Sequence, residues 1–286
     1  MASMRDIKRR KGSIQSTQQI TKAMKLVSTV KLQRSKQRAL NSKDYFSYMY
    51  RTVQSMLAKA GSVSHPYVTG NTSTTKAVIV MTGNRGLAGG YNSNVIKLIT
   101  KGDLPKEDLL IYTLGKKGRE AFNRYGYRLA EDYSAMIDAP DYVDAMRLCN
   151  VLLNQYRNGE IGEIYLAYTS FKNTVSHIPT LMKLLPVEKG ELEEEESTKA
   201  EAPMNFEPAE EEALDLIIPK YVASIIYGAM IEAVASENGA RMQAMDSATS
   251  NAEEMIDKLT LQYNRARQGS ITQELTEIIA GAQAIS

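Results

Sequence analysis

The fold of this chain is decided by residues 221–286, YVASIIYGAMIEAVASENGARMQAMDSATSNAEEMIDKLTLQYNRARQGSITQELTEIIAGAQAIS. It contains no proline, so no residue in it interrupts the hydrogen bonds of a helix. As one helix it would span roughly 100 Å at about 1.5 Å per residue. Globular helices usually have about three turns, so a helix of this length is expected to pack along a partner.

Small and apolar residues recur at every seventh position of this stretch. One seam consists of Tyr221, Gly228, Ala235, Met242, Thr249, Ile256 and Tyr263. A second, at the complementary offset, consists of Ile231, Asn238, Met245, Ala252, Leu259 and Ala266. Two such seams are typical of the a and d positions of a coiled coil. Each glycine weakens an isolated helix by about 1 kcal/mol relative to alanine, so this helix depends on its partner.

The N-terminal segment is the expected partner. Residues 4–58 contain no proline, and a patchy stripe at helical spacing runs through Ile7, Ile14, Ile20, Met24, Val27 and Val30, with Thr17, Thr21 and Ser28 also on it. Residues 1–43 carry 12 basic residues against Asp6 alone, a net +11, whereas residues 210–286 carry 12 acidic and 5 basic residues, a net −7. Two interpretations of the basic helix stay open: the solvated face of a coiled coil, or an arm that binds nucleic acid.

The middle of the chain changes its periodicity. Strands are expected at 77–81, 109–113, 161–171 and 178–185, and helices at 91–101, 116–124 and 141–157, the first of them capped by Asn92 or Ser93. This alternation predicts a small α/β sheet. The chain therefore divides into an N-terminal helix (1–60), a central α/β domain (74–187), an acidic linker or foot (188–212) and a C-terminal helix (213–286).

Composition sets bounds on the protein class. Of 286 residues, 43% are hydrophobic and 24% charged, an ordinary balance for a protein with a packed core. No apolar run approaches the roughly 20 residues that a membrane span needs, and we expect neither a signal peptide nor a transit peptide. Cys149 is the single cysteine; it excludes an intrachain disulfide and is expected to be a buried thiol.

The sequence contains no recognisable catalytic site. The glycine-rich segment 83–90 follows a strand, but Tyr91 and Asn92 stand where a phosphate-binding loop has lysine and serine or threonine, and its glycine spacing is not that of a dinucleotide site. We interpret it as a strand-to-helix turn. His65 and His177 lie far apart and one cysteine cannot build a zinc site, so neither a metal nor a cofactor is expected.

The C-terminal end, 270–286, has no charged residue after Glu277 and carries several isoleucines and a leucine. It is either a frayed amphipathic end or a segment that an apolar socket receives, because an exposed apolar end is costly to solubility.

Four segments resemble the gamma subunit of F-type ATP synthases: SIQSTQQITKAMKLV (13–27), RGLAGG (85–90), SENGARMQAM (236–245) and YNRARQGSITQELTE (263–277). The last is the most specific, and the resemblance runs from end to end. It implies an α/β fold in which long N- and C-terminal helices form an antiparallel coiled coil beside a central Rossmann-like α/β domain.

The resemblance implies a non-catalytic rotating shaft. Such a shaft, one copy per complex, stands in an alpha3beta3 hexamer and sits with epsilon on the membrane c-ring, so that ion flow drives the catalytic beta subunits through different nucleotide affinities. It implies a peripheral location on the cytoplasmic side of the cell membrane and a bacterial source. A nucleic-acid-binding coiled coil remains the alternative.

The resemblance also assigns residues by position. Contacts with the surrounding subunits would involve Lys8, Arg9, Met24, Lys25, Arg241, Arg267, Gln268, Thr272, Ile278, Ile279 and Ile285, and the c-ring foot would include Phe206, Glu207 and Pro208. The chain departs from the family at two positions, where Asn84 replaces a common aspartate and Ala88 a common cysteine. The first departure puts a charge-based role of this turn in doubt, and the lone Cys149 argues against control by a dithiol.

Overall fold

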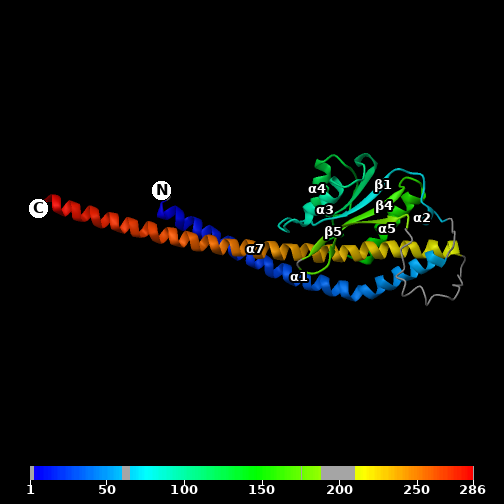
Figure 1. Ribbon diagram of the computed structural model, residues 1–286, viewed down its shortest axis with the longest axis horizontal. Coiled ribbons are helices and arrows are strands. Elements are labelled where there is room, and N and C mark those ends of the chain that lie inside the picture. The colour runs from blue at the N-terminus through cyan, green and yellow to red at the C-terminus, as the bar shows by residue number, and fades with distance from the viewer. Residues whose placement is uncertain (1–2, 60–64, 175, 188–209, 286) are drawn as a thin grey trace. The chain divides into compact units, whose positions relative to one another are not determined.

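The computed structural model describes residues 3–59, 65–174, 176–187 and 210–285 (Figure 1). The chain forms two compact units. We call residues 29–240 the α/β unit, and residues 1–28 with 241–286 the helical unit. Each is described by itself.

The α/β unit is built on a five-stranded sheet in the order β3-β2-β1-β4-β5. The strands are β1 (Lys76–Met81), β2 (Leu109–Leu114), β3 (Arg128–Asp132), β4 (Glu163–Phe171) and β5 (His177–Leu185). β1 pairs in parallel with β2 and β4, and β2 pairs in parallel with β3. Only β5 runs antiparallel to its neighbour β4, so the sheet is mixed.

Helices cover both faces of this sheet, which is why β1 is apolar without alternation. On one face, α3 (Tyr91–Thr100) and α4 (Lys116–Arg124) pack against Val78 and Val80. On the other face, α5 (Tyr142–Arg157) and the first part of α7 (Glu210–Ile285) pack against Ala77, Ile79 and Met81. Two short elements, α2 (Pro66–Thr69) and the 3-10 helix η1 (Lys106–Asp108), lie in the connections.

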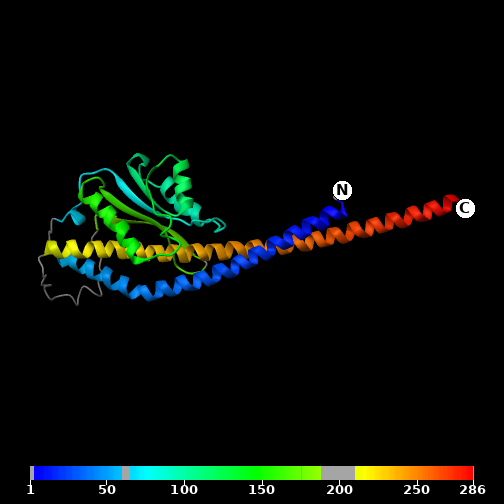
Figure 2. The ribbon, with the colours of Figure 1, turned by 180° about the vertical axis from the view of Figure 1, so that it is seen from behind.

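The helical unit pairs the beginning of α1 (Met4–Lys59) with the part of α7 around Asp246 and Thr249, and the last turns of α7 extend beyond the first residues of α1 (Figures 1 and 2). The hydroxyls of Thr21 and Thr249 lie 2.8 Å apart, and Lys25 Nζ lies 2.6 Å from Asp246 Oδ1. As the position rises along α1 it falls along α7, so the two helices are antiparallel.

The seams predicted on α7 face inward. Met245, Ala252 and Leu259 of the helical unit are buried, as are Tyr221, Ile231 and Ala235 of the α/β unit. The stripe predicted on the N-terminal helix is partly wrong. Ile20 and Val27 are exposed, whereas Thr21 and Ser28 are buried together with Ile7. Seven-residue spacing from Ile7 through Ile14 reaches Thr21 and Ser28, so the period set the inward face and hydrophobicity did not.

The predicted fold class, an α/β protein with long terminal helices, is confirmed. Two local predictions are wrong. Strand β3 was not predicted, because RLAED is polar and lies at the edge of the sheet. The cap of α3 is Gly90, with no side-chain capping bond. Asn92 instead accepts the backbone N–H of Gly83, and Ser93 donates to the carbonyl of Gly90.

Helix α7 is long and apolar enough to satisfy a membrane-span criterion by length and composition. However, 56% of its most apolar window is buried inside the protein. Leu214, Ile218, Val222, Ile226 and Met230 belong to the core of the α/β unit. Packing against the sheet therefore accounts for its apolar composition.

Candidate functional site

The residues assigned to subunit contacts mostly lie on the surface of the helical unit. Lys8, Arg9, Arg267, Gln268, Thr272, Ile278 and Ile279 are exposed, and Met24, Lys25 and Arg241 are partly buried. Ile285 is the last residue of α7, and its side chain is outside the described part of the structure. Phe206, Glu207 and Pro208 also lie outside the described residues.

Two of the assigned cations already have partners within the chain. Lys25 bonds to Asp246 across the helix pair, and Arg9 pairs with Asp6 one turn away at 3.3 Å. The Arg9 side chain is 84% exposed. Because exposed ion pairs contribute about 0–1 kcal/mol, Arg9 can exchange Asp6 for another carboxylate at little cost.

The end of α7 presents apolar side chains to solvent. Ile271, Leu275, Ile278 and Ile279 are between 49% and 68% exposed. These residues recur at spacings of three and four and so share one side of the helix. Such a surface is typical of a segment that another protein covers.

The glycine-rich segment is a tight turn between β1 and α3, as interpreted from its sequence. Leu87 and Gly89 have positive φ angles of 62° and 55°. Asn84 holds the turn: its side-chain amide donates to the Ser134 carbonyl and to Asp138 Oδ2, both at 2.9 Å. Its side-chain oxygen accepts the Lys116 N–H, also at 2.9 Å. Asn84 therefore joins three loops, a role that an aspartate could fill only in part.

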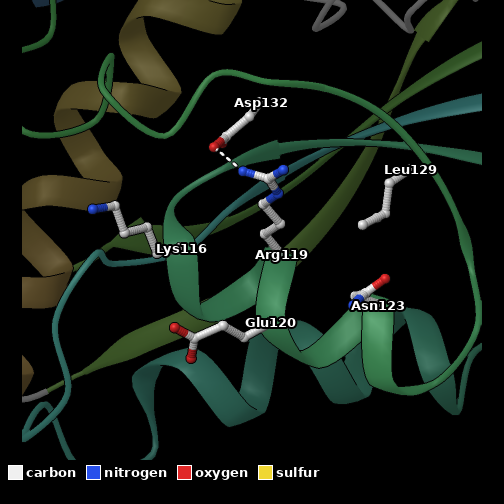
Figure 3. Close-up of a pocket in the computed structure, with 6 residues that line it drawn as sticks. All are labelled: Lys116, Arg119, Glu120, Asn123, Leu129 and Asp132. Carbon is white, nitrogen blue, oxygen red and sulfur yellow. Dashed lines mark hydrogen bonds and ion pairs between the residues drawn. The ribbon is translucent and has the colours of Figure 1, made fainter.

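A cavity of about 380 Å³ opens beside α4 and β3 (Figure 3). It is lined by Lys116, Arg119, Glu120, Asn123, Leu129 and Asp132. Arg119 reaches across to Asp132, whereas Lys116 and Glu120 point away from this pair (Figure 3). Hydrogen bonds from Ser134, together with Arg119, hold the pKa of Asp132 below its usual range. An ionised, paired aspartate is a poor general base.

Two other groups with reactive side chains, Cys149 and Glu163, are held by burial and by ion pairs. Burial raises the pKa of Cys149 to about 12, and its thiol lies 3.5 Å from the Pro219 carbonyl. Glu163 lies between Lys76 and Lys183, at 3.1 and 2.8 Å. Among the described residues, no three of His, Cys, Asp and Glu are placed to hold a metal ion.

No local sequence pattern indicated the polar contacts that hold the first part of α7 in place, because each joins residues at least 58 positions apart. Glu232 accepts hydrogen bonds from the end of β4, and Ser236 donates to a β4 carbonyl. Nearer the start of α7, Asp215 lies 2.9 Å from Arg157 and 3.5 Å from His65.

Together these features define a class of protein: an antiparallel pair of long helices joined to a small α/β unit, with exposed polar and apolar side chains on the helices. A family model described as ATP synthase matches residues 3–285. The ATP synthase gamma chain of Lachnoclostridium phytofermentans is 63% identical, with all of both chains covered. That of Alkaliphilus metalliredigens is 43% identical over 99% of this chain and 98% of the relative.

The chain belongs to the ATP synthase gamma chain family, the central stalk subunit of that enzyme complex. Both of these relatives are bacterial. Among solved structures, the Euglena gracilis mitochondrial ATP synthase contains a chain with the same fold: TM-score 0.67, 18% identity, 99% of this chain and 94% of the other covered. The family match gives no support to the nucleic-acid alternative.

Proposed function

We propose that this chain is the rotating shaft that couples ion flow through a membrane c-ring to the nucleotide cycle of an alpha3beta3 hexamer. The helical unit would stand inside the hexamer, and the α/β unit, with epsilon, would sit on the ring. The observation that carries the proposal is the antiparallel pairing of α1 with α7, which makes a rod with two different sides.

A shaft must present different surfaces to three identical neighbours. Here α1 contributes exposed cations, among them Lys8 and Arg9, whereas α7 contributes exposed acids such as Glu253 and Asp257. At a hydrated interface, charged side chains affect the preferred rotational angle and the rate of association more than the binding affinity. Rotation of this rod would therefore alternate which beta subunit meets the basic side.

Two segments of α7 would contact the hexamer in different ways. Arg267, Gln268 and Thr272 are exposed and can make charge-assisted or polar hydrogen bonds to loops of beta. The apolar side that contains Ile278 and Ile279 would lie in a hydrophobic sleeve. Apolar contact is non-directional, so such a bearing holds the rod without fixing its angle.

The chain itself would be non-catalytic, and ATP would form at alpha/beta interfaces. What supports this is the chemistry of its described surface, where the cavity at α4 holds a neutralised ion pair and the one thiol is buried. As part of this complex, the chain is peripheral to the membrane. We place it on the cytoplasmic side, as the bacterial relatives suggest.

The test is assembly with alpha and beta followed by single-molecule rotation driven by ATP. Removing 273–286 should weaken torque or assembly, and Ile278→Ser/Ile279→Ser should reproduce part of the loss because the bearing becomes polar. Glu274→Gln, an exposed change on the same segment, is the control and should rotate as the wild type does. ATP turnover by the purified chain alone, or normal rotation of both altered chains, would contradict the proposal.

A further inference from the structure

Helix α7 is fastened to the end of β4 by directional polar contacts. One carboxylate oxygen, Glu232 Oε2, accepts hydrogen bonds from Ser170 Oγ at 2.9 Å and from the Phe171 backbone N–H at 3.1 Å. One turn later, Ser236 Oγ donates to the Thr169 carbonyl at 3.1 Å. We call these three hydrogen bonds the β4 clamp.

The β4 clamp lies on one side of α7 and is tightly enclosed. Ser236 is completely buried. Gly239 follows Glu232 by seven positions and so shares its side of the helix. A side chain at Gly239 would have no room, since a Cβ there would lie 2.6 Å from His177 Nε2 on β5. Helix and sheet therefore meet at this point without space for sliding.

The position of the clamp in the sheet is informative. The chain leaves β1 toward β2 and β3 and later returns to the other side of β1 as β4, so the order in which strands are added reverses between the parallel strands β1 and β4. In open α/β sheets this crevice at the carboxyl ends of the strands is where ligands bind. Here α7 contacts the ends of both strands: Glu232 bonds at the end of β4, and Glu237 packs against Gly83 after β1.

We propose that the β4 clamp fixes the rotational angle of α7 on the sheet and is the contact through which torque passes between the sheet and α7; this inference rests on the proposed function. Nearer its start, α7 packs on the core through Ile218, Val222 and Ile226. Apolar packing resists separation but has no preferred direction, whereas hydrogen bonds weaken steeply when their angle changes. Glu232 and Ser236 are therefore positioning residues.

The variants follow from the geometry. Glu232→Ala removes two of the three clamp bonds, and Ser236→Ala removes the third. Glu232→Gln is the rescue, because both donors meet one oxygen and an amide oxygen can accept both. Ser224→Ala is the matched control for Ser236→Ala: Ser224 is also a buried serine of α7, but its hydroxyl donates to Lys220 of the same helix.

Two measurements are made on the full chain assembled with its complex. Hydrogen exchange of the Phe171 amide should accelerate about tenfold in Glu232→Ala, because that N–H loses its acceptor. Angular fluctuation is then followed with a probe on the α/β unit while α7 is held by the hexamer. If the three bonds resist twisting in parallel, losing two of them should raise the angular variance about twofold, with the apolar packing supplying the remaining stiffness.

Support requires faster exchange and larger variance in Glu232→Ala, a smaller increase in Ser236→Ala, and wild-type values in Glu232→Gln and Ser224→Ala. Unchanged exchange at Phe171 would show that the clamp does not form, and the inference would be overturned. Faster exchange with unchanged variance would overturn the torque role while the wild-type complex still rotates. A wild-type complex that does not rotate would instead remove the proposed function, and this inference with it.

Discussion

Replacing Asn84 by aspartate tests how the turn after β1 is held. The side-chain amide of Asn84 donates to the Ser134 carbonyl and to Asp138 Oδ2, and its oxygen accepts the Lys116 N–H. Asn84→Asp keeps the acceptor and loses both donors. It also places a second carboxylate where the amide now contacts Asp138. The family resemblance makes aspartate the common residue here, so a substitution toward the family is expected to destabilise this chain.

The magnitude follows from the lost and gained interactions. The two lost hydrogen bonds contribute about 1 kcal/mol each, or about 2 kcal/mol together. Solvent exposure reduces this sum little, because one of the two acceptors is the charged carboxylate of Asp138. Two carboxylates at about 4 Å repel by about 1 kcal/mol in a water-like environment. Asn84→Asp should therefore lower the free energy of unfolding by about 3 kcal/mol, and thermal unfolding by roughly 6–12 °C for a unit of this size.

The assay is urea unfolding of the purified chain at pH 7, with two comparison variants. Asn84→Ala loses all three hydrogen bonds without adding charge, and so separates loss of bonding from repulsion. In Asn84→Asp/Asp138→Asn the donor and the carboxylate exchange places, which should recover more than half of the loss. The reasoning is refuted if Asn84→Asp unfolds as the wild type does, or if adding Asp138→Asn restores nothing.

Three further predictions concern buried polar groups. Glu163→Gln should lower stability by about 1–2 kcal/mol at pH 7: burial opposes ionisation of Glu163, but bonds from its two lysines lower its pKa overall. Because that stabilisation exists above the unfolded pKa near 4.5 and is lost as pH falls through the lower folded pKa, wild type and variant should converge in acid-titrated unfolding curves. Cys149 should react with iodoacetamide at pH 8 more than about a hundredfold slower in the native chain than in urea, because its pKa is about 12; equal rates would contradict burial. Thr21→Val should cost at most about 1 kcal/mol, because it removes the hydroxyl contact with Thr249 while the Thr249 hydroxyl keeps the Met245 carbonyl as a partner. Thermal unfolding by circular dichroism should show the same loss in Thr21→Val/Thr249→Val, since either change removes the same contact; no loss in Thr21→Val would contradict it.

Periodicity predicted the main helices and strands. The predictions were wrong where the hydrophobicity of the local sequence does not report burial. A buried strand such as 77–81 and a heptad seam such as Met245, Ala252 and Leu259 record burial directly in the local sequence. Strand β3 does not, because an edge strand buries little and tolerates Arg128, Glu131 and Asp132. The exposed Ile20 and Val27 were assigned to the inward stripe by their hydrophobicity, although the period placed Thr21 and Ser28 there.

The candidate site divides along the same line. Residues assigned by resemblance, such as Arg267 and Gln268, lie in a contiguous sequence motif, which one sequence is enough to identify. Their exposure agrees with a contact surface. Their contacts themselves remain predictions. Contacts such as Glu232 with Ser170 and Asn84 with Asp138 are set by how strands and helices meet in space. No local sequence pattern encodes these tertiary contacts, so a single sequence does not predict them.

The charge difference between the two ends of the chain is better explained by external partners than by attraction between its own helices. If attraction between α1 and α7 were its purpose, bases and acids would meet along the seam, which instead contains Ile7, Met245 and Leu259. Lys25 does bond to Asp246, but exposed pairs of this kind contribute about 0–1 kcal/mol. In the helical unit the bases of α1 mostly point outward, whereas α7 carries exposed acids and bases together. A rod with one basic side and one side of mixed charge has an orientation that its surroundings can sense, and this is the property that a shaft turning among three identical subunits requires.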